Sequence, residues 1–110
     1  MLNIEQLKNE FAARLKPLNP EKVILFGSYA RGNQKEDSDI DLYVVTGDDF
    51  IPRNFREKME IKLKISQSIL DLRMKYPFDL VVHTKPMHKK FIDLDSSFAR
   101  EIQANGVRLI

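Results

Sequence analysis

One continuous stretch, VILFGSYARGNQKEDSDIDLYVV at residues 23–45, constrains the fold more than any other part of the chain. It holds two short apolar runs, at residues 23–26 and 40–45, which are rich in β-branched residues and separated by a polar connection. Such runs, bounded by glycine and polar clusters, are typical of strands. The stretch therefore predicts two strands, with Gly27-Ser28 directly after the first and Asp39-Ile40-Asp41 opening the second.

Asp39 and Asp41 begin the second predicted strand with one residue between them. Because side chains alternate across a strand, both carboxylates point the same way, with Cα atoms about 6.5 to 7 Å apart. Two negative charges at about 5 Å repel by roughly 3 kcal/mol at an effective dielectric constant near 20. A cation would offset this repulsion, so the pair indicates a metal site at Asp39 and Asp41.

Gly27 and Ser28 allow two interpretations. A Gly-Ser turn that opens a short helix presents free backbone N–H groups, and the serine hydroxyl adds a donor, which together suit phosphate oxygens. The alternative is an ordinary strand-to-helix turn with Ser28 as the N-cap residue. Arg31 lies within one helical turn of Ser28, where it either steadies a bound triphosphate or forms a surface salt bridge.

The chain resembles the minimal nucleotidyltransferases of the DNA polymerase beta superfamily. Their signature is matched by Gly-Ser, ten residues and then Asp-x-Asp, within FGSYARG and SDIDLYVV. The resemblance covers both flanking strands and the spacing between them. It implies transfer of a nucleoside monophosphate, with ATP as the substrate and Mg²⁺ as the cofactor, two ions being expected. It also favours nucleotide binding at Gly27, Ser28 and Arg31, and metal binding with catalysis at Asp39 and Asp41.

The run Phe78–His83 predicts a third strand with an aspartate near its start. Asp79 is unusual in an apolar strand, because a buried carboxylate needs a partner or a metal; otherwise it is exposed at the strand end. Members of the family that the chain resembles carry a third aspartate on the strand after a long helix, and Asp79 fits that place. The resemblance therefore implies that Asp79 is a third catalytic metal ligand, which assists deprotonation of the attacking hydroxyl.

The remaining pattern predicts one domain over residues 1–110, with an α/β fold. We expect a small mixed sheet of three to four strands, with helices packed mainly on one face. Helices are predicted at about Ile4–Lys16, Pro52–Lys75 and Ser97–Ala104, and a last short strand at Val107–Ile110. The basic residues between Lys85 and Lys90 are expected to form a solvated surface.

The predicted helix Pro52–Lys75 carries two apolar rows, which together are wider than the ~100° stripe of an ordinary surface helix. Either both rows face the core, with lysine stems lying over them, or one row faces a partner protein or a second copy of the chain.

Composition excludes several classes. The chain has 43% hydrophobic and 31% charged residues, which argues against disorder. A net charge of +2 gives no strong basic field, so nucleic acid is not expected as a direct partner. The absence of cysteine excludes disulfides and zinc–thiolate sites. No signal peptide or transmembrane run is present, so no membrane partner and a cytoplasmic location are expected.

The size of the chain bears on the acceptor of the nucleotide. Larger relatives carry further domains for the acceptor, so here the acceptor is expected on another protein. The resemblance implies a HEPN-type toxin as that partner, with the chain acting as an antitoxin that adds AMP to a toxin hydroxyl and silences its ribonuclease activity. Two alternatives stay open: an antitoxin that neutralises its partner by contact alone, and an enzyme that modifies a small molecule such as an aminoglycoside, its pocket formed by a homodimer.

Overall fold

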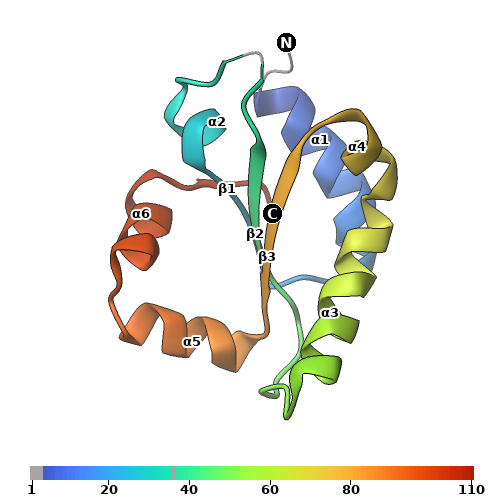
Figure 1. Cartoon of the computed structure of the whole chain (residues 1–110), viewed down its shortest axis with the longest axis vertical. Helices are drawn as coiled ribbons and strands as arrows, with labels where there is room; N and C mark the ends of the chain where they lie inside the picture. The colour runs from blue at the N-terminus through green and yellow to red at the C-terminus, as the bar shows by residue number, and fades with distance from the viewer. Residues whose placement is uncertain (1–3, 36) are drawn as a thin grey trace.

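The computed structural model describes residues 4–35 and 37–110 and places a four-stranded sheet at the centre of the molecule (Figure 1). The strands are β1 (Lys22–Phe26), β2 (Ile40–Val45), β3 (Phe78–His83) and β4 (Val107–Arg108). Their order in the sheet is β3-β2-β1-β4. β1 is antiparallel to β2 and to β4, whereas β2 and β3 run parallel. The predicted mixed sheet of an α/β fold is confirmed.

Helices cover both faces of this sheet (Figure 1). On one side lie α1 (Ile4–Leu15), α3 (Phe55–Ser68) and α4 (Leu70–Lys75). On the other side lie α5 (Lys85–Asp93) and α6 (Ser97–Asn105), and the short α2 (Gly27–Arg31) leads from β1 toward β2. A 3₁₀ turn, Lys16–Leu18, follows α1. In the described part of the chain, no helix has the length and apolar character needed to cross a bilayer.

The larger core lies on the face covered by α1, α3 and α4. Its buried side chains alternate along the strands, as the two-residue period requires; they include Val23 and Leu25 of β1, Ile40, Leu42 and Val44 of β2, and Leu80 and Val82 of β3. A smaller cluster on the opposite face joins Tyr43, Val45 and Ile102 to partly buried residues of α5 and the sheet. The larger core thus lies on one face of the sheet. The helices were expected mainly on one face; α1, α3 and α4 lie there, and α5 and α6 add a second layer on the other.

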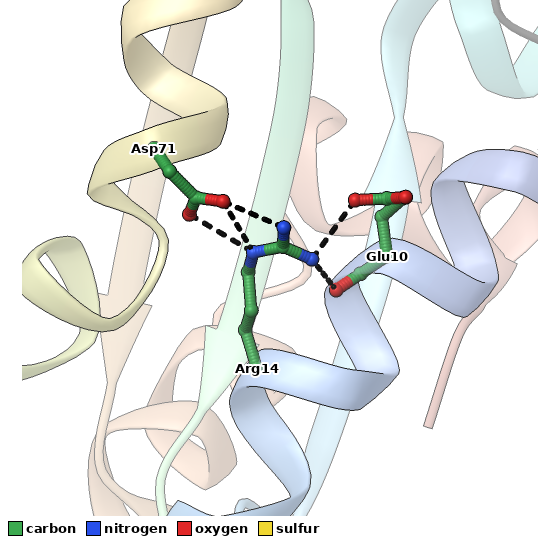
Figure 2. Close-up of polar contacts among 3 residues, drawn as sticks. All are labelled: Glu10, Arg14 and Asp71. Carbon is green, nitrogen blue, oxygen red and sulfur yellow. Dashed lines mark hydrogen bonds and ion pairs between the residues drawn. The ribbon is translucent and has the colours of Figure 1, made fainter.

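An arginine bridges two helices of the larger layer (Figure 2). Arg14 of α1 donates from Nε and Nη2 to the carboxylate of Asp71 of α4, at distances down to 2.6 Å. Its Nη1 donates to the backbone oxygen of Glu10, 2.8 Å away. The paired guanidinium lowers the pKa of Asp71 below its ordinary value. This contact joins α1 to α4, the helix that leads into β3.

The predicted single helix Pro52–Lys75 is wrong in two respects. It begins at Phe55, because the Asn54 side chain accepts a hydrogen bond from the Glu57 N–H at 2.9 Å and caps the helix there. It also breaks at Ile69, whose backbone leaves the helical region at φ −114° and ψ 19°. The Ser68 hydroxyl donates to the Ile65 carbonyl at 2.7 Å, a local bond that competes with the helical pattern and bends helices.

The segment between Lys85 and Lys90 lies in a helix, α5, whereas the sequence predicts only a solvated basic surface there. Thr84 holds the extended N-cap conformation and Pro86 lies in the first turn, a position that tolerates the missing N–H. Phe91 lies in the last part of the helix and packs against the smaller core. Basic residues therefore occupy the outer side of an amphipathic helix.

Candidate functional site

The three predicted carboxylates lie at the same end of the sheet, where β2 and β3 begin. Because these strands run parallel and in register, Asp41 lies directly beside Asp79. Paired positions in a sheet carry their side chains on the same face. Asp39 directly precedes Ile40, the first residue of β2, rather than lying within the strand. The β2–β3 register therefore positions two of the carboxylates, and the entry to β2 positions the third.

Gly27 fits closely against Asp41. β1 ends at Phe26, which pairs with Asp41 in the antiparallel register, and Gly27 follows with φ +74°. A Cβ at residue 27 would lie 2.1 Å from Oδ2 of Asp41, well inside contact distance. Only glycine both adopts this left-handed conformation freely and leaves room for the carboxylate. The backbone of Gly27 therefore lies directly against the Asp41 carboxylate, with no side chain between them.

The charge of Asp41 is disfavoured in this setting. Its pKa is raised above the ordinary value first by burial, then by the neighbouring charges of Asp79 and Asp39. Arg31 acts in the opposite direction and lowers the pKa. The two other carboxylates and the guanidinium are thus close enough to act on Asp41 electrostatically, which makes it the central group of the cluster.

Ser28 and Arg31 both lie in α2, as the sequence predicts, with Gly32 ending the helix at φ +76°. No side chain caps the start of α2, so the alternative of Ser28 as N-cap residue is not observed. Arg31 forms an ion pair with Glu101 of α6, Nη1 to Oε1 2.7 Å. This ion pair is the salt bridge that the sequence analysis kept as the alternative for Arg31, and its nucleotide contact remains a prediction.

The donor set fits a hard divalent cation in its chemistry. Across residues 4–35 and 37–110, no three His, Cys, Asp or Glu side chains are gathered closely enough to hold a metal ion. Mg²⁺, however, is usually bound through one or two carboxylates together with substrate phosphates and waters, not by a complete protein cage. The crowded negative charge around Asp41 is the observation that favours a cation here. Asp39, Asp41 and Asp79 are the residues that would hold it.

A second polar cluster was not predicted. It lies on the face of β2 and β3 that carries Asp41 and Asp79. The hydroxyl of the fully buried Tyr43 lies 2.9 Å from Nδ1 of His83 and 2.8 Å from Nδ1 of His88. Burial lowers the pKa of both histidines and raises that of the Tyr43 hydroxyl. The sequence gives His83 only as the last residue of the third predicted strand. Its position two residues after Val81 on the Asp79 face was the available signal, because that face is covered by α5.

Comparisons with known proteins identify relatives of this chain. The family model described as "Polymerase beta, Nucleotidyltransferase" matches residues 5–110. Several proteins of Methanocaldococcus jannaschii, each named "Putative protein adenylyltransferase", are similar in sequence. One is 31% identical over 107 residues, which cover 96% of this chain and 94% of that protein. Another is 47% identical over 47 residues, 43% of this chain and 42% of that protein, so the match spans less than half of it.

Two solved structures share the fold. A chain from the crystal structure of a toxin–antitoxin with AMP-PNP aligns with a TM-score of 0.56 and 22% identity, over 94% of this chain and 72% of that chain. A chain from a mutant of the toxin–antitoxin MntA-HpeT aligns with a TM-score of 0.55 and 20% identity, over the same shares of 94% and 72%.

Proposed function

This chain belongs to the polymerase beta nucleotidyltransferase family, and we propose that it is a Mg²⁺-dependent protein adenylyltransferase that transfers AMP from ATP to a hydroxyl of a partner protein. The position of Asp41 is the observation that carries the proposal. The charges of Asp39 and Asp79 act on its carboxylate, Asp79 is its partner in the neighbouring strand, and the carboxylate packs against the backbone of Gly27. That arrangement places acidic groups beside a turn that suits phosphates. The names of the similar archaeal proteins support a protein acceptor.

Each group has a distinct task in the proposed reaction. The free N–H groups of the Gly27-Ser28 turn and the Ser28 hydroxyl bind the β- and γ-phosphates. Held this way, the α-phosphorus faces the acceptor for in-line attack. The acceptor oxygen forms a bond to the α-phosphorus, the bond from that phosphorus to the bridging oxygen of the β-phosphate breaks, and pyrophosphate leaves. Asp79, exposed at the start of β3, takes the proton of the acceptor hydroxyl.

Asp39 and Asp41 are the proposed holders of the cation. A bound divalent cation would supply charge to offset the carboxylates and phosphates and would make the acceptor hydroxyl more acidic. Asp41 is fixed by the sheet register and by the backbone of Gly27, so it is the better positioned of the two. Asp39 lies outside the strand and is exposed, which leaves it accessible to the substrate side.

The partner that we propose is a toxin of the HEPN type, with this chain as its antitoxin. Two structural neighbours are toxin–antitoxin assemblies, and one of them was crystallised with an ATP analogue. Modification of a toxin hydroxyl by AMP would silence its ribonuclease activity. A surface on which such a protein can dock is provided by the exposed apolar side chains of α3 and α4: Phe55, Met59, Leu63, Leu70 and Met74.

Transfer of label from α-³²P-ATP to the co-expressed partner tests the proposal. The unaltered chain is expected to label the partner in Mg²⁺, whereas Asp39→Asn and Asp41→Asn are expected to lower the labelling rate by roughly two orders of magnitude or more. Asp37→Asn is the matched control, because it is the same substitution at an exposed aspartate of the preceding loop. Equal labelling by all four proteins would reject catalysis at this site.

The same variants also test the second candidate function, neutralisation by contact alone. One observation favours it: a row of exposed apolar side chains on α3 and α4 with no role in the carboxylate site. On this alternative, Asp39→Asn/Asp41→Asn would protect cells from the partner as well as the unaltered chain does. Loss of protection in the double variant, with partner binding retained, would favour the enzyme.

A further inference from the structure

Phe98 is a large exposed aromatic residue beside the carboxylate site, with no role in the reaction proposed above. It lies in the first turn of α6, and 38% of the residue remains exposed. Its ring packs against Phe26, with ring centroids 5.3 Å apart and planes inclined by 68°. Phe26 in turn is the strand partner of Asp41 and the residue directly before Gly27. Phe98 is therefore separated from the acidic cluster and the phosphate turn by a single side chain.

The orientation of the Phe98 ring is fixed from two sides. Besides Phe26, it contacts Phe91 of α5, with centroids 5.5 Å apart and planes inclined by 73°. One turn further along α6, Glu101 forms the ion pair with Arg31 that holds α6 against α2. Two ring contacts and a nearby ion pair thus hold an exposed aromatic surface at the rim of the site. A side chain ordered in this way loses little further freedom when a ligand binds to it.

We propose that Phe98 is the stacking platform for the base of the nucleotide, an inference that rests on the proposed function. Phosphates at Gly27-Ser28 and a base on Phe98 would place the two ends of one nucleotide on neighbouring parts of the same face. Aromatic rings bind bases through stacking that is tolerant of base identity, since every base presents a π-face. Phe98 would therefore discriminate weakly between ATP and GTP, with only a modest preference for purines, whose larger rings stack more strongly.

Equilibrium binding of ATP to the full chain in Mg²⁺ tests the inference. Phe98→Ala is expected to weaken ATP binding by about tenfold, and Phe98→Trp to retain it. Inorganic tripolyphosphate, which has no base, is the discriminating ligand: its affinity is expected to be equal in the unaltered chain and in Phe98→Ala. Leu94→Ala is the control, because Leu94 is 80% exposed in the link between α5 and α6.

Three results would overturn the inference. Unchanged ATP affinity in Phe98→Ala would exclude a base contact while leaving the proposed function intact. Equal weakening of ATP and tripolyphosphate would show that Phe98 supports the shape of the phosphate turn instead. Absence of ATP binding by the unaltered chain would overturn both this inference and the proposed function.

Discussion

Gly27 and Asp41 depend on one another in size and in backbone conformation. The sequence predicts a turn at Gly27 and a carboxylate at Asp41, but it does not show that they touch. Their contact follows from the antiparallel register of β1 and β2, which pairs Phe26 with Asp41. The residue types of the site are thus readable from the sequence, whereas the reason for glycine at residue 27 is a tertiary contact.

Replacement of Gly27 by alanine should cost more than the same change at Gly32. Both glycines have a positive φ, +74° and +76°, so backbone strain of about 1 to 2 kcal/mol applies to each. Only at Gly27 does the new Cβ meet Asp41; at Gly32 nothing lies within 4 Å. We therefore expect Gly27→Ala to lower the free energy of unfolding by about 1 to 3 kcal/mol more than Gly32→Ala does. Urea denaturation measures both.

A double variant isolates the cause of that difference. In an Asp41→Ala background the carboxylate is gone, so the excess cost of Gly27→Ala should disappear. An excess that persists in this background would assign the cost to another part of the turn.

At the scale of elements, the strands were more predictable than the helices. Short β-branched runs gave β1, β2 and β3 within a residue or so, and the predicted helix Ser97–Ala104 ends one residue before α6 does. The break at Ile69 was not readable, because a serine at residue 68 is compatible with an unbroken helix, and only the fold shows its hydroxyl bonded to the Ile65 carbonyl. The contact of Tyr43 with His83 and His88 joins residues 40 and 45 positions apart, and only the fold decides that they meet.

The two apolar rows of the predicted helix Pro52–Lys75 have different surroundings in the structure. One row, with Ile65, Ile69 and Leu72, is buried against the sheet. The other remains exposed and comprises Phe55, Met59, Leu63, Leu70 and Met74, at 41% to 81% of their surface. An exposed row of this length is typical of a protein-docking surface.

Leu63→Glu should weaken binding of the proposed partner protein without harming the fold. Leu63 is 54% exposed, so a charge there costs the folded state little, within about 0.5 kcal/mol. A charge in a desolvated contact should weaken partner binding by about tenfold or more, as measured by calorimetry. Leu94→Glu, at 80% exposure outside the row, serves as the control. Unchanged partner affinity, or a shift only in self-association of the chain, would contradict the prediction.

At the scale of the whole molecule, stability and function oppose one another at Asp41. Burial and the charges of Asp79 and Asp39 raise its pKa, so the folded state disfavours ionised Asp41 relative to the unfolded chain. The folded state therefore holds the proton of the Asp41 carboxyl more tightly than the unfolded chain does. The stability gained from this proton is lost as pH rises through the raised pKa of Asp41. Without divalent cations, Asp41→Asn should consequently melt at a higher temperature than the unaltered chain at pH 7. That gap should shrink as pH falls through the raised pKa.

Addition of Mg²⁺ provides the second half of this test. A cation that binds only folded protein stabilises it by an amount that grows with the ratio of cation concentration to Kd. Mg²⁺ should therefore raise the melting temperature of the unaltered chain and of Asp37→Asn, but not that of Asp41→Asn. Equal shifts in all three proteins, or a lower melting temperature for Asp41→Asn without cations, would contradict the charge argument.

The parallel pairing of β2 and β3 separates the proposed reaction site from the proposed docking surface. Residues 46–77 form one long excursion between these strands, and the exposed apolar row lies on it. The side-by-side placement of Asp41 and Asp79 depends on the strands that this excursion joins, not on its outer surface. New specificity toward other proteins can therefore evolve by remodelling residues 46–77, while the reaction chemistry is inherited unchanged.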